Sequence, residues 1–256
     1  MGEEILSAVE DSIGVITLNR PETHNAITKE MWKSLPAVFE RLQKKGARAI
    51  VLSGQGDAFA SGADLSELAQ LTDLEVARDF WISIENCLQS IWQFELPVIA
   101  MIQGPCFGGG CLLAAACDMR FASRDATFGV PSARLGIVLD DASIARLVAL
   151  VGVSFARRML YTGSTIFSDE AERRGLVDKV FEVGVLRGEV MRIAALLKHN
   201  EVTALAETKR SINRVQMALH NCFDAVNSDE QRELIIERYL SVEFHERVAK
   251  ALEALQ

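Results

Sequence analysis

The sequence predicts an α/β protein in which a strand-containing core precedes a helical C-terminal region. Short strand-like runs alternate with amphipathic helical patterns up to about residue 140, and helical patterns dominate from there on. The length of 256 residues suits one large domain or two small ones and is enough to bury a core without disulfides or metals. We expect a core over residues 1–197 and a C-terminal helical region over residues 198–256.

Five short runs are expected to be strands because they are apolar, often β-branched, and bounded by turn or helix signals. The first run, IGVITLN, alternates and ends at Arg20-Pro21, whereas PVIAMIQ is apolar almost throughout, as in a buried strand. In chain order the expected strands are 13–19, 47–53, 97–103, 118–122 and 177–181.

Apolar residues at helical spacing predict the helices. Thr28 is placed to cap the first, Pro36 is expected to kink it or to shorten its first part, and Pro97 follows the end of the second. A polar loop with a short helix is expected around residues 62–69, and Ser168 is expected to cap another short helix. The other helices are expected at 28–45, 73–94, 111–116 and 184–198. The tail after residue 199 is expected to continue as helices.

The charge balance excludes several classes of partner. Asp and Glu number 35 against 27 Lys and Arg, so the net charge is -8, and no basic block could neutralise phosphates. No apolar run is long enough to span a bilayer, and the acidic N-terminus has no signal or transit pattern. We expect no nucleic-acid partner, no membrane partner and a cytoplasmic location.

Cysteine and histidine usage argues against disulfides and metals. The 5 cysteines, Cys222 among them, are an odd number in apolar surroundings, which indicates free thiols in a reducing compartment. The 4 histidines are scattered without ligand spacing, so we expect no metal site. Neither a GxSxG elbow nor a phosphate-binding GxxxxGK[ST] loop is present.

Two glycine-containing loops carry the clearest local signal. In IQGPCFGGGC, residues 102–111, a strand leads through three glycines into a helix, whose first N–H groups are unpaired and lie at the positive end of its dipole. A second loop of small residues, FASGADL at 59–65, also follows a strand. Together the loops could offer two N–H donors to one developing oxyanion. The alternatives are a tight strand-to-helix turn and an ordinary surface connection.

Several motifs in register identify a resemblance. They are Arg20-Pro21 with Asn25-Ala26, FASGAD at 59–64, GGGC at 108–111 with Cys117-Asp118, FGVP at 128–131 with LGI at 135–137, and GLV at 175–177. In order and spacing this set resembles the enoyl-CoA hydratase/isomerase family, the crotonase superfamily. The resemblance implies a crotonase-like spiral of ββα units, a helical C-terminal trimerisation region, a homotrimer or dimer of trimers, and an acyl-CoA thioester substrate with no further cofactor.

The resemblance also assigns site residues. The oxyanion hole that holds the thioester oxygen falls on the backbone N–H groups of Ala63 and Gly109. Ala60, Asp64 and Leu65 fall where the family binds coenzyme A.

The chain departs from the hydratase pattern at both of its usual glutamates. Those positions hold Leu112 and Ser132, neither of which can act as a carboxylate base. Asp140 instead aligns with an acid that does the chemistry in several branches of the family, so we expect it to be the catalytic residue. The alternative is that Asp140 or Asp141 simply caps the following helix, and we expect Asp141 to be the cap.

One carboxylate beside an oxyanion hole favours proton transfer that shifts a double bond in an enoyl-CoA, an isomerase-type reaction. A first alternative is a divergent enoyl-CoA hydratase, acyl-CoA hydrolase or decarboxylase, in which Ser132 and Arg134 contact the substrate. A second alternative, of another class, is a non-catalytic acyl-CoA-binding protein. A family member that has lost its catalytic activity would also lack the usual acids.

Overall fold

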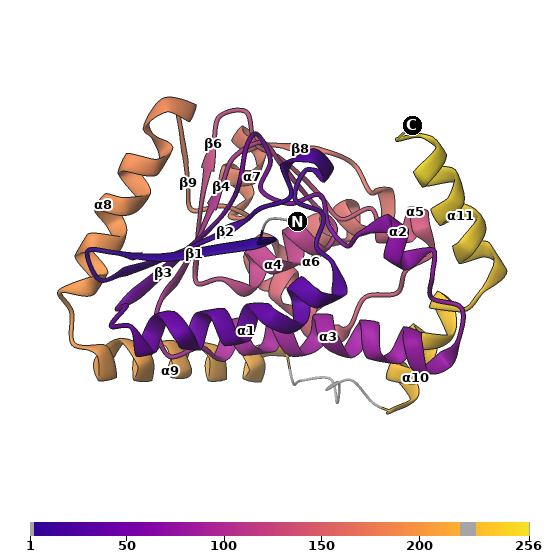
Figure 1. Cartoon of the computed structure of the whole chain (residues 1–256), viewed down its shortest axis with the longest axis horizontal. Helices are drawn as coiled ribbons and strands as arrows, with labels where there is room; N and C mark the ends of the chain where they lie inside the picture. The colour runs from indigo at the N-terminus through magenta and orange to yellow at the C-terminus, as the bar shows by residue number, and fades with distance from the viewer. Residues whose placement is uncertain (1–2, 221–228, 256) are drawn as a thin grey trace.

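The computed structural model describes residues 3–220 and 229–255. A six-stranded sheet in the order β1-β2-β3-β4-β6-β9 forms its centre, with β1 antiparallel to β2 and every other neighbouring pair parallel (Figure 1). Its strands are β1 Ile5–Glu10, β2 Ile13–Leu18, β3 Ala49–Gly54, β4 Val98–Ile102, β6 Met119–Ser123 and β9 Lys179–Phe181.

Helices cover both faces of this sheet because its strands are apolar on both sides. On one face Ile16, Leu52 and Ala100 join the main core with α1 (Lys29–Lys44), α3 (Leu74–Gln93) and α4 (Gly109–Ala116). On the other face Val15, Val51 and Ile99 pack against α8 (Leu186–Lys198), seen in orange at the left of Figure 1. This layering is the α/β arrangement expected from buried parallel strands.

A second sheet of very short strands lies beside the first. It consists of β5 (Pro105–Phe107), β7 (Thr127–Gly129) and β8 (Ile166–Phe167). An isolated bridge joins Ala60 to Cys106 on β5, so the loop after β3 is attached to this sheet. Neither these strands nor β1 was predicted, since three residues are too few for a periodic signal and β1 is half exposed along its length.

The C-terminal helices return to the core. Lys209 on α9 (Val202–His220) places its Nζ 2.8 Å from Asp118 Oδ2, at the start of β6. The helices α10 (Asp229–Tyr239) and α11 (Val242–Glu253) bury apolar residues against α2 (Leu65–Leu68) and α3. We call this the α3–α10 cluster; its buried members are Leu68, Leu71, Ala77, Phe80, Trp81, Ile235, Ile236, Tyr239, Phe244 and Val248. None of the described helices has the length and apolarity needed to cross a membrane.

Most expected elements are present within a few residues, and two details are corrected. Thr28 caps α1 as predicted, with its Oγ1 3.2 Å from the Met31 N–H nitrogen. Pro36 does not shorten α1, which runs from Lys29 to Lys44 with Pro36 inside it; the alternative expectation of a kink stays a prediction. Ser168 does not cap α7 (Ser168–Arg174): Phe167 is at the N-cap position, and the Ser168 hydroxyl donates to the Arg124 carbonyl.

Candidate active site

Two loops meet where the parallel strands β3 and β4 end. Carboxyl ends of parallel strands share one edge of a sheet, which is where ligands commonly bind. The contact between the loops depends on glycine: a Cβ on Gly110 would lie only 2.4 Å from the Ala60 carbonyl oxygen. The Ala60 N–H in turn donates to Pro105 (3.2 Å), and the Ala60 carbonyl accepts from Phe107 (2.9 Å). The two loops predicted to act together are therefore held side by side.

The second loop turns into α4 at Gly108. Its φ of 51° and ψ of -123° suit only glycine, and its N–H donates to the Gly129 carbonyl at 2.8 Å. Gly109 is the first residue of α4, two residues earlier than predicted, so its N–H has no partner within the helix. The predicted donor therefore lies at the positive end of the helix dipole.

Ala63 presents the other predicted donor. The flanking backbone is paired with Ile27, whose N–H donates to the Gly62 carbonyl (2.7 Å) and whose carbonyl accepts from Asp64 (3.1 Å). Between these two bonds the Ala63 N–H makes no hydrogen bond to any described residue. A Cβ built on Gly109 would lie 3.4 Å from the Ala63 nitrogen. The two amide groups are neighbours, as an oxyanion hole requires.

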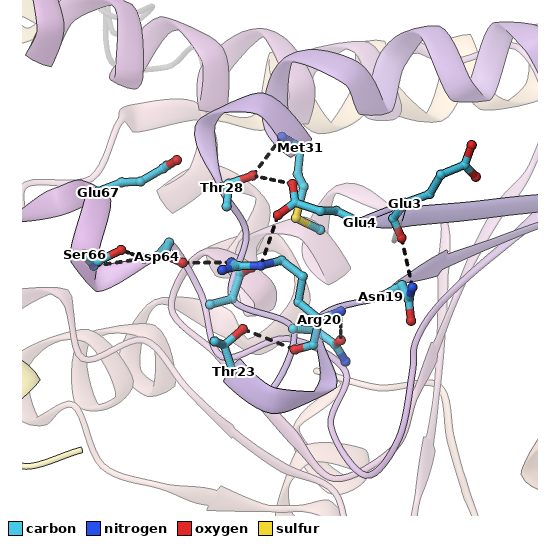
Figure 2. Close-up of polar contacts among 12 residues, drawn as sticks. Glu3, Glu4, Asn19, Arg20, Thr23, Thr28, Met31, Asp64, Ser66 and Glu67 are labelled. Carbon is cyan, nitrogen blue, oxygen red and sulfur yellow. Dashed lines mark hydrogen bonds and ion pairs between the residues drawn. The ribbon is translucent and has the colours of Figure 1, made fainter. Parts of the chain in front are cut away.

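The predicted coenzyme A positions lie around this loop. Ala60 is buried and Leu65 half-buried. Asp64 caps α2, with Oδ1 2.9 Å from the Ser66 nitrogen, and its Oδ2 is 2.8 Å from Arg20 Nη1 (Figure 2). Burial alone would raise the pKa of Asp64, but hydrogen bonds from Ser66 and Arg20 outweigh it and hold that pKa below its ordinary value. The Asp64 carboxylate is thus used to fasten the loop.

Asp140 lies at the start of α6 (Asp141–Thr162). It is 8% exposed, and its Oδ1 accepts from the Ser143 N–H at 2.8 Å, so Asp140 itself is the N-cap. The prediction that Asp141 caps this helix is wrong: Asp141 is in the first turn and accepts from Gln231 of α10. Only the residue before the first turn has its side chain placed to reach the N–H three positions on.

The surroundings of Asp140 come from three helices. Tyr239 of α10 is buried, and burial together with the negative charge of Asp140 raises the pKa of its phenol. Arg146 of α6 donates to Gln89 Oε1 of α3 at 2.9 Å. Burial lowers the pKa of Arg146, and the charges of Asp140 and Glu85 act in the opposite direction.

One apolar cluster contacts both the loop at 59–65, which we call the oxyanion loop, and the segment just before Asp140. Ala63 and Leu65 of the loop pack against the α3–α10 cluster, and so do Ile137 and Val138. Tyr239 is a buried member of the same cluster. The oxyanion loop and the segment that leads to Asp140 therefore share their apolar contacts.

The two positions at which the resemblance predicts the hydratase glutamates hold no acid. Leu112 is buried on α4, and Ser132 is the half-buried first residue of α5 (Ser132–Leu135). Arg134, the alternative substrate contact, donates to the Thr162 carbonyl at 3.1 Å. Over residues 3–220 and 229–255, no three His, Cys, Asp or Glu side chains gather as metal ligands would. The described cysteines are free and buried, and Cys222 lies outside the described residues.

Two neighbouring backbone N–H groups on two loops are an arrangement that can accept a developing oxyanion. The family model of enoyl-CoA hydratase/isomerase matches residues 8–234, and the chain belongs to that family. It is 36% identical to the short-chain-enoyl-CoA hydratase of Clostridium acetobutylicum, covering 80% of this chain and 79% of that one. It is 35% identical to the crotonyl-CoA hydratase of Syntrophomonas wolfei, covering 82% of each.

Solved structures agree with this assignment. An enoyl-CoA hydratase/isomerase from Xanthobacter autotrophicus superimposes with a TM-score of 0.88 at 28% identity, covering 99% of this chain and 94% of that one. The expected crotonase fold and its helical C-terminal region are confirmed.

Three residues of the site have roles that the sequence did not predict. Arg20 belongs to the motif Arg20-Pro21, but nothing in the sequence predicts that it pairs with Asp64. Tyr239 and Arg146 lie in helical patterns and read as ordinary core or surface positions. Their only signal is tertiary, because each meets its partners through packing of helices distant in the chain.

Proposed function

We propose that this protein shifts a double bond in an enoyl-CoA by proton transfer through a thioester enolate. The observation that carries the proposal is one buried carboxylate, Asp140, at the end of a segment that packs against the same apolar cluster as Ala63, whose N–H makes no hydrogen bond to any described residue. Positions 112 and 132, where the resemblance places hydratase acids, hold Leu and Ser. One carboxylate is enough to move a proton between two carbons.

In the proposed mechanism the Asp140 carboxylate removes a proton from C2 of a 3-enoyl-CoA. The C–H electron pair moves into the thioester, and the resulting dienolate oxygen accepts hydrogen bonds from Ala63 and Gly109. The protonated Asp140 then returns the proton to C4, and the double bond forms between C2 and C3. Fixed donors in a site shielded from water favour the charge that develops on the oxygen. Buried Leu112 helps to exclude water, which this reaction does not consume.

We also propose the ligand and assembly that the family implies. Coenzyme A would pass the loop of Ala60, Asp64 and Leu65, with the acyl chain along the wall formed by the α3–α10 cluster. The protein would assemble as a homotrimer or dimer of trimers, which sedimentation of the purified protein measures.

The first test compares Asp140→Asn with Asp141→Asn. Asparagine is as good an N-cap as aspartate, so Asp140→Asn removes the base and keeps the cap of α6. We expect it to lower kcat for 3-enoyl-CoA by about 10²–10⁴-fold, the usual worth of a general base. Asp141→Asn should keep the rate. Unchanged isomerisation by a folded Asp140→Asn variant would refute the proposal.

A second candidate is hydration of a 2-enoyl-CoA, and it is favoured by relatives named as hydratases. It differs in consuming water, so incubation of 2-enoyl-CoA in H₂¹⁸O separates the two reactions. We expect no ¹⁸O in the acyl chain, whereas a hydroxyacyl product labelled with ¹⁸O would establish hydration.

A further inference from the structure

Arg20 lies just after β2, and its guanidinium is enclosed by three separate segments of the chain. Nη1 is 2.7 Å from the Ala26 carbonyl oxygen. Nη1 is also 2.8 Å from Asp64 Oδ2, and Nε is 3.2 Å from Glu4 Oε1 (Figure 2). The Arg20 side chain is only 17% exposed. Its position is therefore well defined, and its charge is poorly screened by water.

From Arg20 a chain of hydrogen bonds leads to the oxyanion hole. The peptide unit of Ala26 and Ile27 accepts from Arg20 through its carbonyl and donates through its N–H to the Gly62 carbonyl at 2.7 Å. The Gly62 carbonyl and the Ala63 N–H belong to one peptide unit, which is the second unit on this hydrogen-bonded path. In a trans peptide these two groups point in opposite directions, so the bond from Ile27 directs the Ala63 N–H away from Ile27.

We propose that Arg20 is a positioning residue that orients and polarises the Ala63 N–H through these two peptide units. A cation at the head of a hydrogen-bonded chain polarises each successive bond, which makes the last N–H a stronger donor. The inference rests on the proposed function in one respect: Ala63 must donate to the substrate oxygen.

The competing explanation is that Arg20 only fastens the loop through its ion pairs. Glu4 offers a matched control because its carboxylate pairs with the same guanidinium through Nε. The Glu4 side chain takes no part in the hydrogen bonds that lead from Arg20 to Ala63. Its Oε2 also accepts from Thr28 Oγ1 at 3.2 Å, which a glutamine oxygen can still do. Glu4→Gln therefore removes an ion pair of Arg20 and leaves the path to Ala63 intact.

The experiment measures the infrared carbonyl band of butyryl-CoA, labelled with ¹³C at the thioester carbon, when it is bound to each variant. A hydrogen bond to the carbonyl weakens its double bond and lowers the frequency. We expect a clear lowering in the wild type and in Glu4→Gln, and a return part-way to the value in water in Arg20→Met. With 3-enoyl-CoA, kcat of Arg20→Met should fall about 10- to 100-fold, as for misplacement of a catalytic group by a fraction of an ångström, with KM changed less than about 3-fold.

A folded Arg20→Met variant with the wild-type band and wild-type kcat would overturn the proposal. If Arg20→Met does not fold, Arg20→Lys decides, because lysine keeps the charge without the planar fork. A band between the wild-type and aqueous values then supports the proposal, and a wild-type band with wild-type kcat contradicts it. Failure of the proposed function looks different: the wild-type complex itself would then show the band at its aqueous frequency.

Discussion

Asp64 combines an N-cap and an ion pair in one buried carboxylate. It caps α2 through Ser66 and pairs with Arg20, while its own N–H donates to Ile27. Figure 2 shows the Asp64 carboxylate between Ser66 and Arg20. Charge at this position is therefore linked to the stability of the oxyanion loop.

The lowered pKa of Asp64 predicts the pH range of this stabilisation. A carboxyl whose folded pKa lies below its unfolded value of 3.8 stabilises the protein fully above that pH, and the contribution is lost as pH falls through the folded pKa. We expect Asp64→Asn to cost about 3 kcal/mol at neutral pH and progressively less below pH 3.8. Urea unfolding of both proteins at a series of pH values measures this. A difference that stays constant down to the lowest pH would contradict it.

At the residue scale the sequence could name candidate acids, but it could not predict their geometry. Asp140 and Asp141 are adjacent and chemically identical, so only the backbone shows which of them caps α6. Tyr239 could not be assigned because its approach to Asp140 depends on how α10 packs. Patterns locate candidate groups, and long-range packing decides what each one meets.

The start of α4 shows how much depends on one helix boundary. Gly109 and Gly110 are adjacent, yet a side chain at each would meet different obstacles. A Cβ on Gly109 would lie 3.1 Å from a ring atom of Trp32 and 3.4 Å from the Ala63 nitrogen. A Cβ on Gly110 would lie 2.4 Å from the Ala60 carbonyl oxygen, which is backbone and cannot easily give way.

We expect the same substitution, glycine to alanine, to affect activity at Gly109 and stability at Gly110. Gly109→Ala should remain folded and lose about 10²–10³-fold in kcat, because a methyl group would occupy space beside the oxyanion donors. Gly110→Ala should mainly lower Tm, because the loops can no longer touch. Thermal melts and rates per folded enzyme separate the two. Equal loss of stability in both variants would contradict this description of the junction.

Elements with sustained periodicity could be predicted within a few residues. The helices α1 and α3 have clear caps at Thr28 and Asp73 and long apolar faces. The three-residue strands β5 and β7 were missed, although β5 holds Ala60 in place. Such short strands exist because the rest of the sheet and the loops position them, so the local sequence contains little sign of them.

At the scale of the whole molecule, the C-terminal helices pack against the core and contact the loop that carries Ala63. The half-buried pair of Lys209 and Asp118 attaches α9 to the sheet, although burial of the Asp118 carboxyl outweighs this pairing and raises its pKa. The helices α10 and α11 then close the α3–α10 cluster over α2 and α3 (Figure 1). The oxyanion loop, the proposed base Asp140 and the apolar cluster thus come from segments spread over almost the entire chain.

The central claim is that a single carboxylate carries a proton between two carbons of the acyl chain. It is tested most directly with 3-enoyl-CoA deuterated at C2, converted in ordinary water under single-turnover conditions. Because Asp140 both removes and returns the hydrogen, we predict a 2-enoyl-CoA product that carries deuterium at C4, detected by NMR and mass spectrometry. A product with only solvent hydrogen at C4, or no isomerised product at all, would contradict the account.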